Sequence, residues 1–194
     1  MSSHLKALAA ALDGFADAAP ITEEWGRRLA EVLGQGGKLL AAGNGGSAAQ
    51  VQHLTAELVG RYRDDRPPFC AIALHSEPSA LTAIMNDYGA DEVFARQLQA
   101  HGRSGDIAVF MSTSGASRNL ITAAQRARRL GVEVWAMTGP APNPLAATAD
   151  RVLCVPSPSP ATVQELHLVA LHMVCEAFDA RIEQLHPSAA EVAS

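Results

Sequence analysis

Residues 38–47, KLLAAGNGGS, join a short apolar run to a glycine-rich loop. An unbroken apolar run is typical of a parallel strand that is buried on both faces of its sheet. The glycines permit a tight turn, and a helix that begins there presents unpaired N–H groups that attract anions. The stretch therefore predicts a sheet of parallel strands, with a ligand beyond their carboxyl ends.

Similar apolar runs alternate with longer helical patterns through the rest of the chain, as they do in βαβ units. We predict two N-terminal helices, at residues 3–18 and 22–34, and later helices at 46–60, 79–87, 91–100, 117–130 and 161–184. Strands are predicted at residues 38–42, 70–74, 106–111, 132–137 and 152–155, with residues 140–144 as a short connection. The expected fold class is α/β, with a five-stranded, mostly parallel sheet flanked by helices.

The chain divides into three predicted segments: N-terminal helices at residues 1–36, one α/β domain at residues 37–186, and a flexible tail at residues 187–194. A chain of 194 residues, 48% of them hydrophobic, is the size of one domain. No run approaches the roughly 18 apolar residues of a membrane span, so no membrane association is expected.

Charge and cysteine usage bear on partners and location. The formal net charge is −5 and the basic residues are scattered along the chain, so no nucleic acid partner is expected. Cys70, Cys154 and Cys175 lie far apart in apolar segments and form no CxxC motif. Such cysteines are typical of a reducing compartment, which makes the cytoplasm the expected location.

The glycine loop, residues 43–47, is an ambiguous motif by itself, because a tight turn alone would also explain it. Gly43, Gly45 and Ala48 fit the G-x-G-x-x-A pattern of dinucleotide-binding domains as well. Such a domain needs an acidic residue at the end of a second strand about 20 residues later. That distance falls at the end of a predicted helix, near residues 61–65, so the dinucleotide alternative is disfavoured.

The hydroxyl loop, STSGAS at residues 112–117, follows the third predicted strand and leads into a helix. Hydroxyls and backbone N–H groups at a helix N-terminus can surround a phosphate without a lysine. A simple helix cap is the alternative, but a cap needs only one hydroxyl. Four hydroxyls therefore favour a phosphate site, and they belong to Ser112, Thr113, Ser114 and Ser117.

His53 and Glu57 lie four residues apart, and so on one face of the helix that starts at the glycine loop. Such a pair is more often a surface contact, but beside a ligand loop it suits a divalent metal such as Zn, with the carboxylate as a general base. His167 and His172 lie on the apolar C-terminal helix, where a buried histidine needs a hydrogen-bond partner. Gln164 lies on the same helix but is separated from His172 by roughly 12 Å of helix rise, so these two could share one metal ion only from opposite sides of it. The sequence by itself does not show which of His167 and His172 would take part in such a site.

Together these motifs resemble the phosphoheptose isomerases of the sugar isomerase (SIS) domain superfamily. The likeness spans about residues 38–177 and keeps the order GNGGS, HLTAELVGRYR, NDYG, STSGAS and QELHLVALH. It implies a homotetramer that converts sedoheptulose 7-phosphate into D-glycero-D-manno-heptose 7-phosphate, the first step toward nucleotide-activated heptose, with one zinc ion per subunit. The N-terminal helices are expected to pack in this oligomer, because they carry an apolar stripe of Leu5, Leu8, Leu12 and Phe15.

The resemblance also implies the roles of individual residues. It implies that Glu57 and His172 are catalytic, which selects His172 over His167 by analogy. The implied metal ligands are His53, Glu57, Gln164 and His172. The implied contacts to the sugar phosphate are Asn44, Gly45, Gly46, Ser47, Glu57, Asn86, Asp87, Ser112, Thr113, Ser114, Ser117 and Gln164.

The implied reaction is an aldose–ketose isomerisation through an enediol: a base moves a proton between C1 and C2 while a metal polarises the carbonyl. A related branch of the superfamily is a tetrameric adaptor that binds the replication initiator protein, and it keeps the HxxxE and QE..H patterns found in this chain. The adaptor is therefore the alternative. We favour the enzyme, because a full set of metal, base and phosphate groups suits chemistry.

Overall fold

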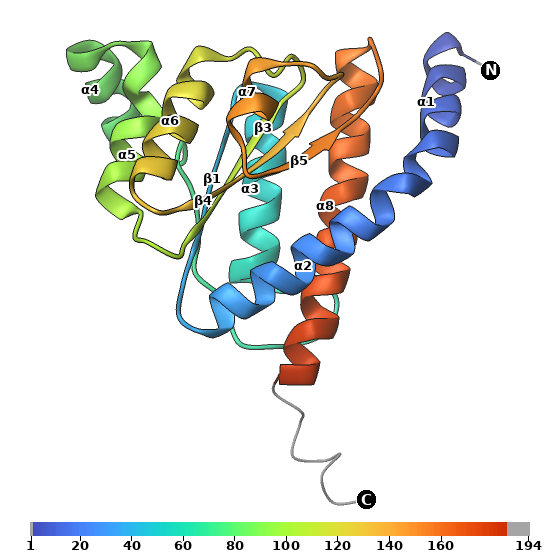
Figure 1. The fold of residues 1–194 in the computed structure, drawn as a ribbon, viewed down its shortest axis with the longest axis horizontal. Helices are drawn as coiled ribbons and strands as arrows, with labels where there is room; N and C mark the ends of the chain where they lie inside the picture. Colours follow the sequence, from blue (N-terminus) through green and yellow to red (C-terminus); the bar gives the residue numbers. More distant parts are fainter. Residues whose placement is uncertain (1, 186–194) are drawn as a thin grey trace, which may run out of the picture.

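The computed structural model describes residues 2–185, so the predicted flexible tail at residues 187–194 lies outside the described part. Helices and strands alternate after an N-terminal helical region (Figure 1). The strands are β1 (Leu39–Gly43), β2 (Ala71–Ala73), β3 (Ile107–Ser112), β4 (Glu133–Thr138) and β5 (Arg151–Cys154). The helices are α1 (Ser3–Asp13), α2 (Ala19–Gly34), α3 (Gly46–Val59), α4 (Pro78–Tyr88), α5 (Val93–His101), α6 (Arg118–Arg129), α7 (Pro144–Thr148) and α8 (Pro160–Leu185), with 3-10 turns η1 (Gly14–Ala18) and η2 (Ala90–Glu92).

The sheet has the order β2-β1-β3-β4-β5, and all of its strands are parallel. Leu39 of β1 pairs with Ala71 on one side and with Ile107 on the other. The predicted α/β fold with five strands is confirmed, and each strand begins and ends within one residue of its predicted position. Within residues 2–185 no helix combines the length and apolar character that a membrane crossing requires.

Two helical segments differ from the prediction. The predicted helix at residues 3–18 is divided after Asp13, where the 3-10 turn η1 begins. The residues predicted as a connection, 140–144, lead into the short helix α7. Asn143 caps α7 by accepting a hydrogen bond from the Ala146 N–H at 2.9 Å, and Pro144 fills the first helical position. With five residues, α7 is too short to show a helical period in the sequence.

Alternate strand residues face two hydrophobic clusters, one on each side of the sheet. Leu39 and Ala41 of β1 join the cluster that includes residues of α2, α3 and α8. Leu40 and Ala42 join the cluster that includes residues of α5, α6 and α7. Helices therefore cover both faces of the sheet, and the strands are buried as their continuous apolar character predicts.

Helix α1 extends beyond the sheet, beside α8 (Figure 1). Leu5 and Leu12 are 51% and 43% exposed, whereas Phe15 of η1 is buried and Leu8 packs against the core. His4 contacts α8 through a hydrogen bond of 2.7 Å between its Nε2 and Glu165 Oε1. Only part of the predicted apolar stripe is thus covered within the protomer.

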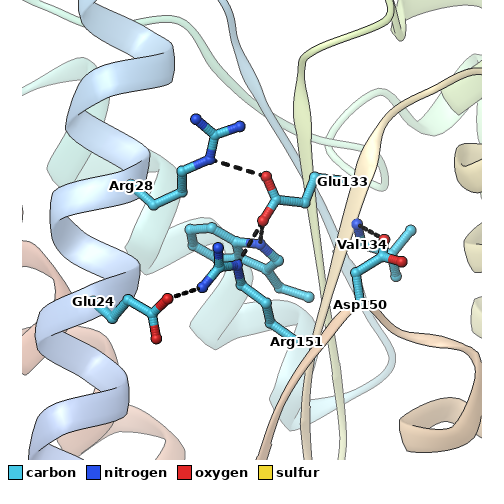
Figure 2. A network of polar contacts seen from close by, with 7 residues as sticks. Glu24, Arg28, Glu133, Val134, Asp150 and Arg151 are labelled. Atoms are coloured by element: carbon cyan, nitrogen blue, oxygen red, sulfur yellow. Dashed lines mark hydrogen bonds and ion pairs between the residues drawn. The ribbon is translucent and has the colours of Figure 1, made fainter.

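Charged side chains close the amino-terminal ends of β4 and β5 (Figure 2). Glu133 accepts hydrogen bonds from Trp135 Nε1 at 2.9 Å, Arg151 Nε at 2.6 Å and Arg28 Nε at 3.0 Å. Arg151 also pairs with Glu24 of α2. Burial raises the pKa of Glu133, but these hydrogen bonds outweigh it and lower the pKa below its ordinary value. The network ties α2 to the edge of the sheet.

Candidate active site

The glycine loop and the hydroxyl loop lie side by side at the carboxyl ends of the strands. The first follows β1 and the second follows β3, and these strands pair throughout, with Gly43 opposite Met111. The strand order changes direction here, because β2 lies on one side of β1 and β3 on the other. Ligands of open α/β sheets bind at such a switch point.

The glycine loop brings α8 close to the start of α3. Gly45 has a φ of +55°, a backbone conformation that favours glycine. A Cβ atom on Gly46 would lie 2.7 Å from Nε2 and Oε1 of Gln164, so a larger residue here would push the end of this side chain away from the loop. Ser47 is buried, and α3 begins without a side-chain cap. The Ser47 and Ala48 N–H groups donate to the Asn44 and Gly45 carbonyls at 3.1 Å, and the positive end of the α3 dipole remains available to an anion.

The hydroxyl groups of the hydroxyl loop contact one another. Ser112 Oγ lies 3.2 Å from Ser117 Oγ and 3.5 Å from Ser114 Oγ, and it accepts a hydrogen bond from the Gly115 N–H at 3.1 Å. Ser117 occupies the N-cap position of α6 but makes no side-chain cap hydrogen bond. A helix cap therefore does not account for these hydroxyls, which gather at a helix N-terminus as an anion site requires.

The segment after β4 supports the hydroxyl loop from behind. A Cβ atom on Gly139 would lie 2.1 Å from the Thr113 carbonyl oxygen, and one on Gly115 would lie 2.0 Å from Asn143 Oδ1. The Leu145 N–H donates to the Gly115 carbonyl at 2.9 Å. Gly139 thus permits a close approach to the Thr113 backbone, and Gly115 a close approach to the Asn143 side chain; both contacts fix the position of the loop.

His167, which was not among the predicted metal ligands, belongs to this support and lies apart from His53. It is fully buried, and its Nε2 lies 3.2 Å from the Thr138 carbonyl oxygen, so Nε2 carries the proton. Burial lowers the pKa of His167 to about 4, which leaves the ring neutral at neutral pH. Thr138 in turn accepts a hydrogen bond from Asn143 Nδ2 at 2.9 Å.

His53, Glu57 and His172 form the imidazole–carboxylate cluster, between α3 and α8. His53 Nε2 lies 2.9 Å from Glu57 Oε1 and 3.3 Å from His172 Nε2. The two imidazole rings meet edge to face, with centroids 5.2 Å apart. Of the two histidines on α8, His172 is therefore the one that the fold places against His53.

A polar seam connects this cluster to the glycine loop along α3 and α8. At the N-terminus of α3, Gly46 contacts Gln164. One turn later Gln50 Nε2 donates to the Gln164 carbonyl at 2.5 Å, and about one turn after that His53 contacts His172. His53 follows Gly46 by seven residues, which is about 10 Å of rise along the helix. One extended ligand of about that length would contact both the glycine loop and the cluster.

Two residues after α3 hold the cluster in place. The Arg66 side chain is only 7% exposed and forms an ion pair of 2.7 Å with Asp179 of α8. It also donates hydrogen bonds to the Glu57 carbonyl at 2.7 Å and to the Leu58 carbonyl at 3.1 Å. It thus satisfies carbonyls at the end of α3. The Tyr62 ring stacks on His172, with centroids 5.8 Å apart.

The donor atoms of the cluster suit zinc, which binds imidazole nitrogen and carboxylate oxygen. Two nitrogen ligands of a tetrahedral zinc ion lie about 3.3 Å apart, and His53 Nε2 and His172 Nε2 are separated by 3.3 Å. In the described residues, however, no group of three or more His, Cys, Asp or Glu side chains is arranged to hold a metal ion. Gln164, the remaining implied ligand, lies against Gly46 instead. The donor chemistry fits zinc, but the described protomer does not assemble a complete ligand set.

Asn86 and Asp87 lie apart from the cluster, at the exposed end of α4. Asn86 Nδ2 donates to Asp87 Oδ1 at 2.8 Å, and Asp87 lines a shallow hollow of about 450 Å³ between α4 and α5. Figure 1 places α4 on the opposite side of the sheet from α8. The fold of one protomer therefore does not bring these two residues to the imidazole–carboxylate cluster.

Sequence reasoning missed Asn119, Arg66, Tyr62 and Asn143. Asn119 pairs with Asn44 through hydrogen bonds of 3.1 and 3.0 Å. Its position two residues after the hydroxyl loop could have marked Asn119 as a candidate site residue. Arg66 lies in a polar stretch that is typical of an exposed loop, and its partner Asp179 is 113 residues away. No local sequence pattern therefore indicates that Arg66 is buried and paired.

Comparison with known proteins identifies the family. Residues 5–139 match the SIS domain family. The chain is 67% identical over 181 residues to a phosphoheptose isomerase of Streptomyces coelicolor, covering 93% of this chain and 78% of the relative. It is 44% identical over 180 residues to a phosphoheptose isomerase of Thiobacillus denitrificans, covering 91% of each chain.

Two solved structures share the fold across nearly the whole chain. A phosphoheptose isomerase from Francisella tularensis superposes with a TM-score of 0.87 at 34% identity, covering 92% of this chain and 95% of that one. A phosphoheptose isomerase from Neisseria gonorrhoeae superposes with a TM-score of 0.85 at 38% identity, covering 92% and 96%. The chain therefore belongs to the phosphoheptose isomerase family of SIS domain proteins.

Proposed function

We propose that this chain converts sedoheptulose 7-phosphate into D-glycero-D-manno-heptose 7-phosphate, as the first step toward nucleotide-activated heptose. The observation that carries the proposal is the polar seam, in a chain of this family. It leads from two loops suited to a phosphate to the imidazole–carboxylate cluster, in which His53 lies against both Glu57 and His172. Such a layout suits a ligand with a phosphate at one end and a reacting carbon at the other.

In the proposed reaction the hydroxyl loop and the N-terminus of α3 hold the phosphate, and Glu57 takes the proton that moves between C1 and C2. His172 supplies or accepts a proton at the sugar oxygen as the enediol forms and collapses. His53 and Arg66 keep Glu57 in position through its side chain and its backbone carbonyl. A zinc ion held by His53, Glu57 and His172, with Gln164, would polarise the sugar carbonyl.

The direct experiment is incubation of purified, zinc-loaded protein with sedoheptulose 7-phosphate, followed by NMR of the sugar. The proposal expects signals of an aldoheptose 7-phosphate to grow at the expense of the ketose. Metal analysis of the same preparation tests the expected stoichiometry of one zinc per subunit. A preparation with bound zinc that leaves the ketose unchanged would contradict the proposal.

The adaptor alternative gains no support from the relatives described above, which carry the isomerase name. An experiment can still distinguish an adaptor from an isomerase. Were the chain an adaptor, an immobilised replication initiator protein would retain it, and Glu57→Gln would leave that binding intact. Retention without isomerase turnover would favour the adaptor over the enzyme.

The proposed assembly is a homotetramer in which the N-terminal helices contribute to the subunit contacts. Leu5 and Leu12 are exposed on α1, and an exposed apolar stripe gains stability when another surface covers it. A subunit contact would also give Asn86 and Asp87 a route to the site of another subunit. Light scattering that gives the mass of one 20.3 kDa chain at all working concentrations would exclude the tetramer.

The proposed location is the cytoplasm. Cys70, Cys154 and Cys175 are all free thiols, as is usual in a reducing compartment. Fractionation of cells that express the protein, with a cytoplasmic marker as the control, tests this location; recovery with an extracellular or membrane fraction would contradict it.

A further inference from the structure

Asn119, the second residue of α6, joins the glycine loop to the hydroxyl loop. Asn44 Nδ2 donates to Asn119 Oδ1 at 3.1 Å, and Asn119 Nδ2 donates to Asn44 Oδ1 at 3.0 Å. We call this reciprocal contact the amide pair. Asn44 belongs to the glycine loop, and Asn119 follows the hydroxyl loop by two residues. The contact therefore spans the gap between the two loops beyond the ends of β1 and β3.

The backbone of α6 determines how the amide pair is oriented. The Leu120 N–H donates to Asn119 Oδ1 at 2.9 Å, so this oxygen faces the helix N-terminus. Asn119 must then present Nδ2 as a donor to Asn44, and Asn44 Oδ1 must accept. A side-chain amide has two N–H donors and the pair uses one from each residue, so Asn44 keeps one N–H for a ligand.

We propose that Asn119 is a positioning residue for binding of the sugar phosphate. It orients the Asn44 amide and holds the glycine loop at a fixed distance from the hydroxyl loop, so that both loops meet one phosphorylated ligand together. The inference rests on the proposed function for the identity of the sugar, but not for the binding of a phosphate group. Preformed spacing reduces the conformational entropy that binding must otherwise remove from two separate loops.

A double-mutant cycle tests whether Asn119 acts through Asn44. Loss of the hydrogen bonds in Asn119→Ala is expected to raise KM for sedoheptulose 7-phosphate about 3- to 10-fold, with a smaller change in kcat. The double variant Asn44→Ala/Asn119→Ala should have the KM of Asn44→Ala alone, because Asn119 has then lost its partner. An unchanged KM in Asn119→Ala, or a double variant whose KM reflects the product of the two single effects, would overturn the proposal.

Gln99→Ala is the matched control. Gln99 is an exposed amide on α5 that accepts a hydrogen bond from Arg126, which lies on α6 as Asn119 does. Gln99 belongs to neither loop. Its removal should leave KM within about twofold of the parent, since surface substitutions away from such features have small effects. An equal rise of KM in both variants would mean that any lost contact to α6 weakens binding, which would count against a positioning role of Asn119.

Inorganic phosphate provides a readout that does not depend on turnover. In the parent, titration with phosphate should shift the backbone amide NMR signals of residues 44–47 and 112–117 together. In Asn119→Ala the signals of residues 112–117 should still shift, while those of residues 44–47 respond weakly. Joint shifts of equal size in both proteins would overturn the proposal, as would a parent in which phosphate shifts neither loop. If the parent does not turn over the sugar, but its joint shifts become unequal in Asn119→Ala as expected, the proposed function fails and the role of Asn119 stands.

Discussion

The two ends of the sheet use polar residues in opposite ways. At the amino-terminal ends of the strands, acidic side chains are saturated by neighbours: Glu133 accepts hydrogen bonds from three side chains, and Asp106 accepts the backbone N–H groups of Lys38 and Arg103 and pairs with the Lys38 ammonium at 2.7 Å. At the carboxyl ends, the loops carry glycines, hydroxyls and uncapped helix starts. At the first end, charged groups satisfy one another. At the second end, the hydroxyls contact only neutral groups of the loop itself, and an anion can replace those contacts.

This difference separates residues that stabilise the fold from residues that serve the ligand. Polar groups that satisfy one another contribute to stability and offer little to a substrate. Hydroxyls and helix N–H groups that meet at a switch point can instead be satisfied by an anion. Substitutions at the carboxyl ends should therefore change kinetics more than stability, and substitutions at the amino-terminal ends should do the reverse.

The largest effect is expected for Glu57→Gln. The substitution keeps the shape of the side chain but removes the base, so kcat should fall by about 10²- to 10⁴-fold. The amide oxygen can still serve as a ligand, so zinc content measured by metal analysis should fall less than turnover does. The control is Glu133→Gln at the other end of the sheet, which should turn over as the parent does. A Glu57→Gln protein within a few-fold of the parent would remove Glu57 from the mechanism.

The double variant Ser112→Ala/Ser117→Ala should show the next largest effect. Hydrogen bonds to a charged phosphate contribute roughly 1.5 to 3 kcal/mol each, so KM should rise about 10²-fold or more while the circular dichroism spectrum stays that of the parent. Steady-state kinetics give the KM. Unchanged affinity for the phosphorylated sugar would exclude the hydroxyl loop as the phosphate site.

His167 makes the support behind the hydroxyl loop sensitive to acid. Its pKa is lowered by burial from 6.5 to about 4, so between these values the unfolded chain binds a proton that the folded chain does not. Stability should therefore fall as the pH falls through this window, by at most roughly 1.4 kcal/mol per pH unit from this residue. Urea unfolding at several pH values measures the slope. His167→Gln should flatten it, and an equal slope in both proteins would contradict this assignment.

The smallest effect is expected for Glu133→Gln. The carboxylate is partly exposed, so loss of its charge should lower the free energy of unfolding by only about 1 to 2 kcal/mol. Because its pKa lies below the ordinary 4.5, the parent should lose this contribution only as the pH falls below that value, beneath most of the His167 window. Urea unfolding at neutral pH gives the difference. A changed kcat/KM with unchanged stability would reverse the comparison between the two ends.

Most of the fold was predictable because each strand is a continuous apolar run, and the loops stood out by their glycines and hydroxyls. The choice between His167 and His172 was not predictable from these residues. They are five positions apart, or about 140° around the helix, so they face different neighbours. His167 contacts Thr138 and His172 contacts His53, and this assignment depends on how α8 packs against the sheet and against α3. The resemblance named His172, and the packing gives a physical reason for it.

Contacts between distant segments were also beyond local patterns. The Asn44–Asn119 pair and the Arg66–Asp179 pair each join residues that no period or motif relates. Asn86 and Asp87 illustrate the converse, because a motif names them while the protomer places them at the end of α4, away from the imidazole–carboxylate cluster.

Solvent deuterium uptake at C1 and C2 of the sugar tests the central claim most directly, namely that Glu57 moves a proton at the end of the polar seam. Sedoheptulose 7-phosphate is incubated in D₂O with the parent, Glu57→Gln or Glu133→Gln, and the label is followed by NMR. The account predicts uptake with the parent and with Glu133→Gln, and uptake with Glu57→Gln that is slower by about 10²-fold or more. Uptake with Glu57→Gln as fast as with the parent would contradict it.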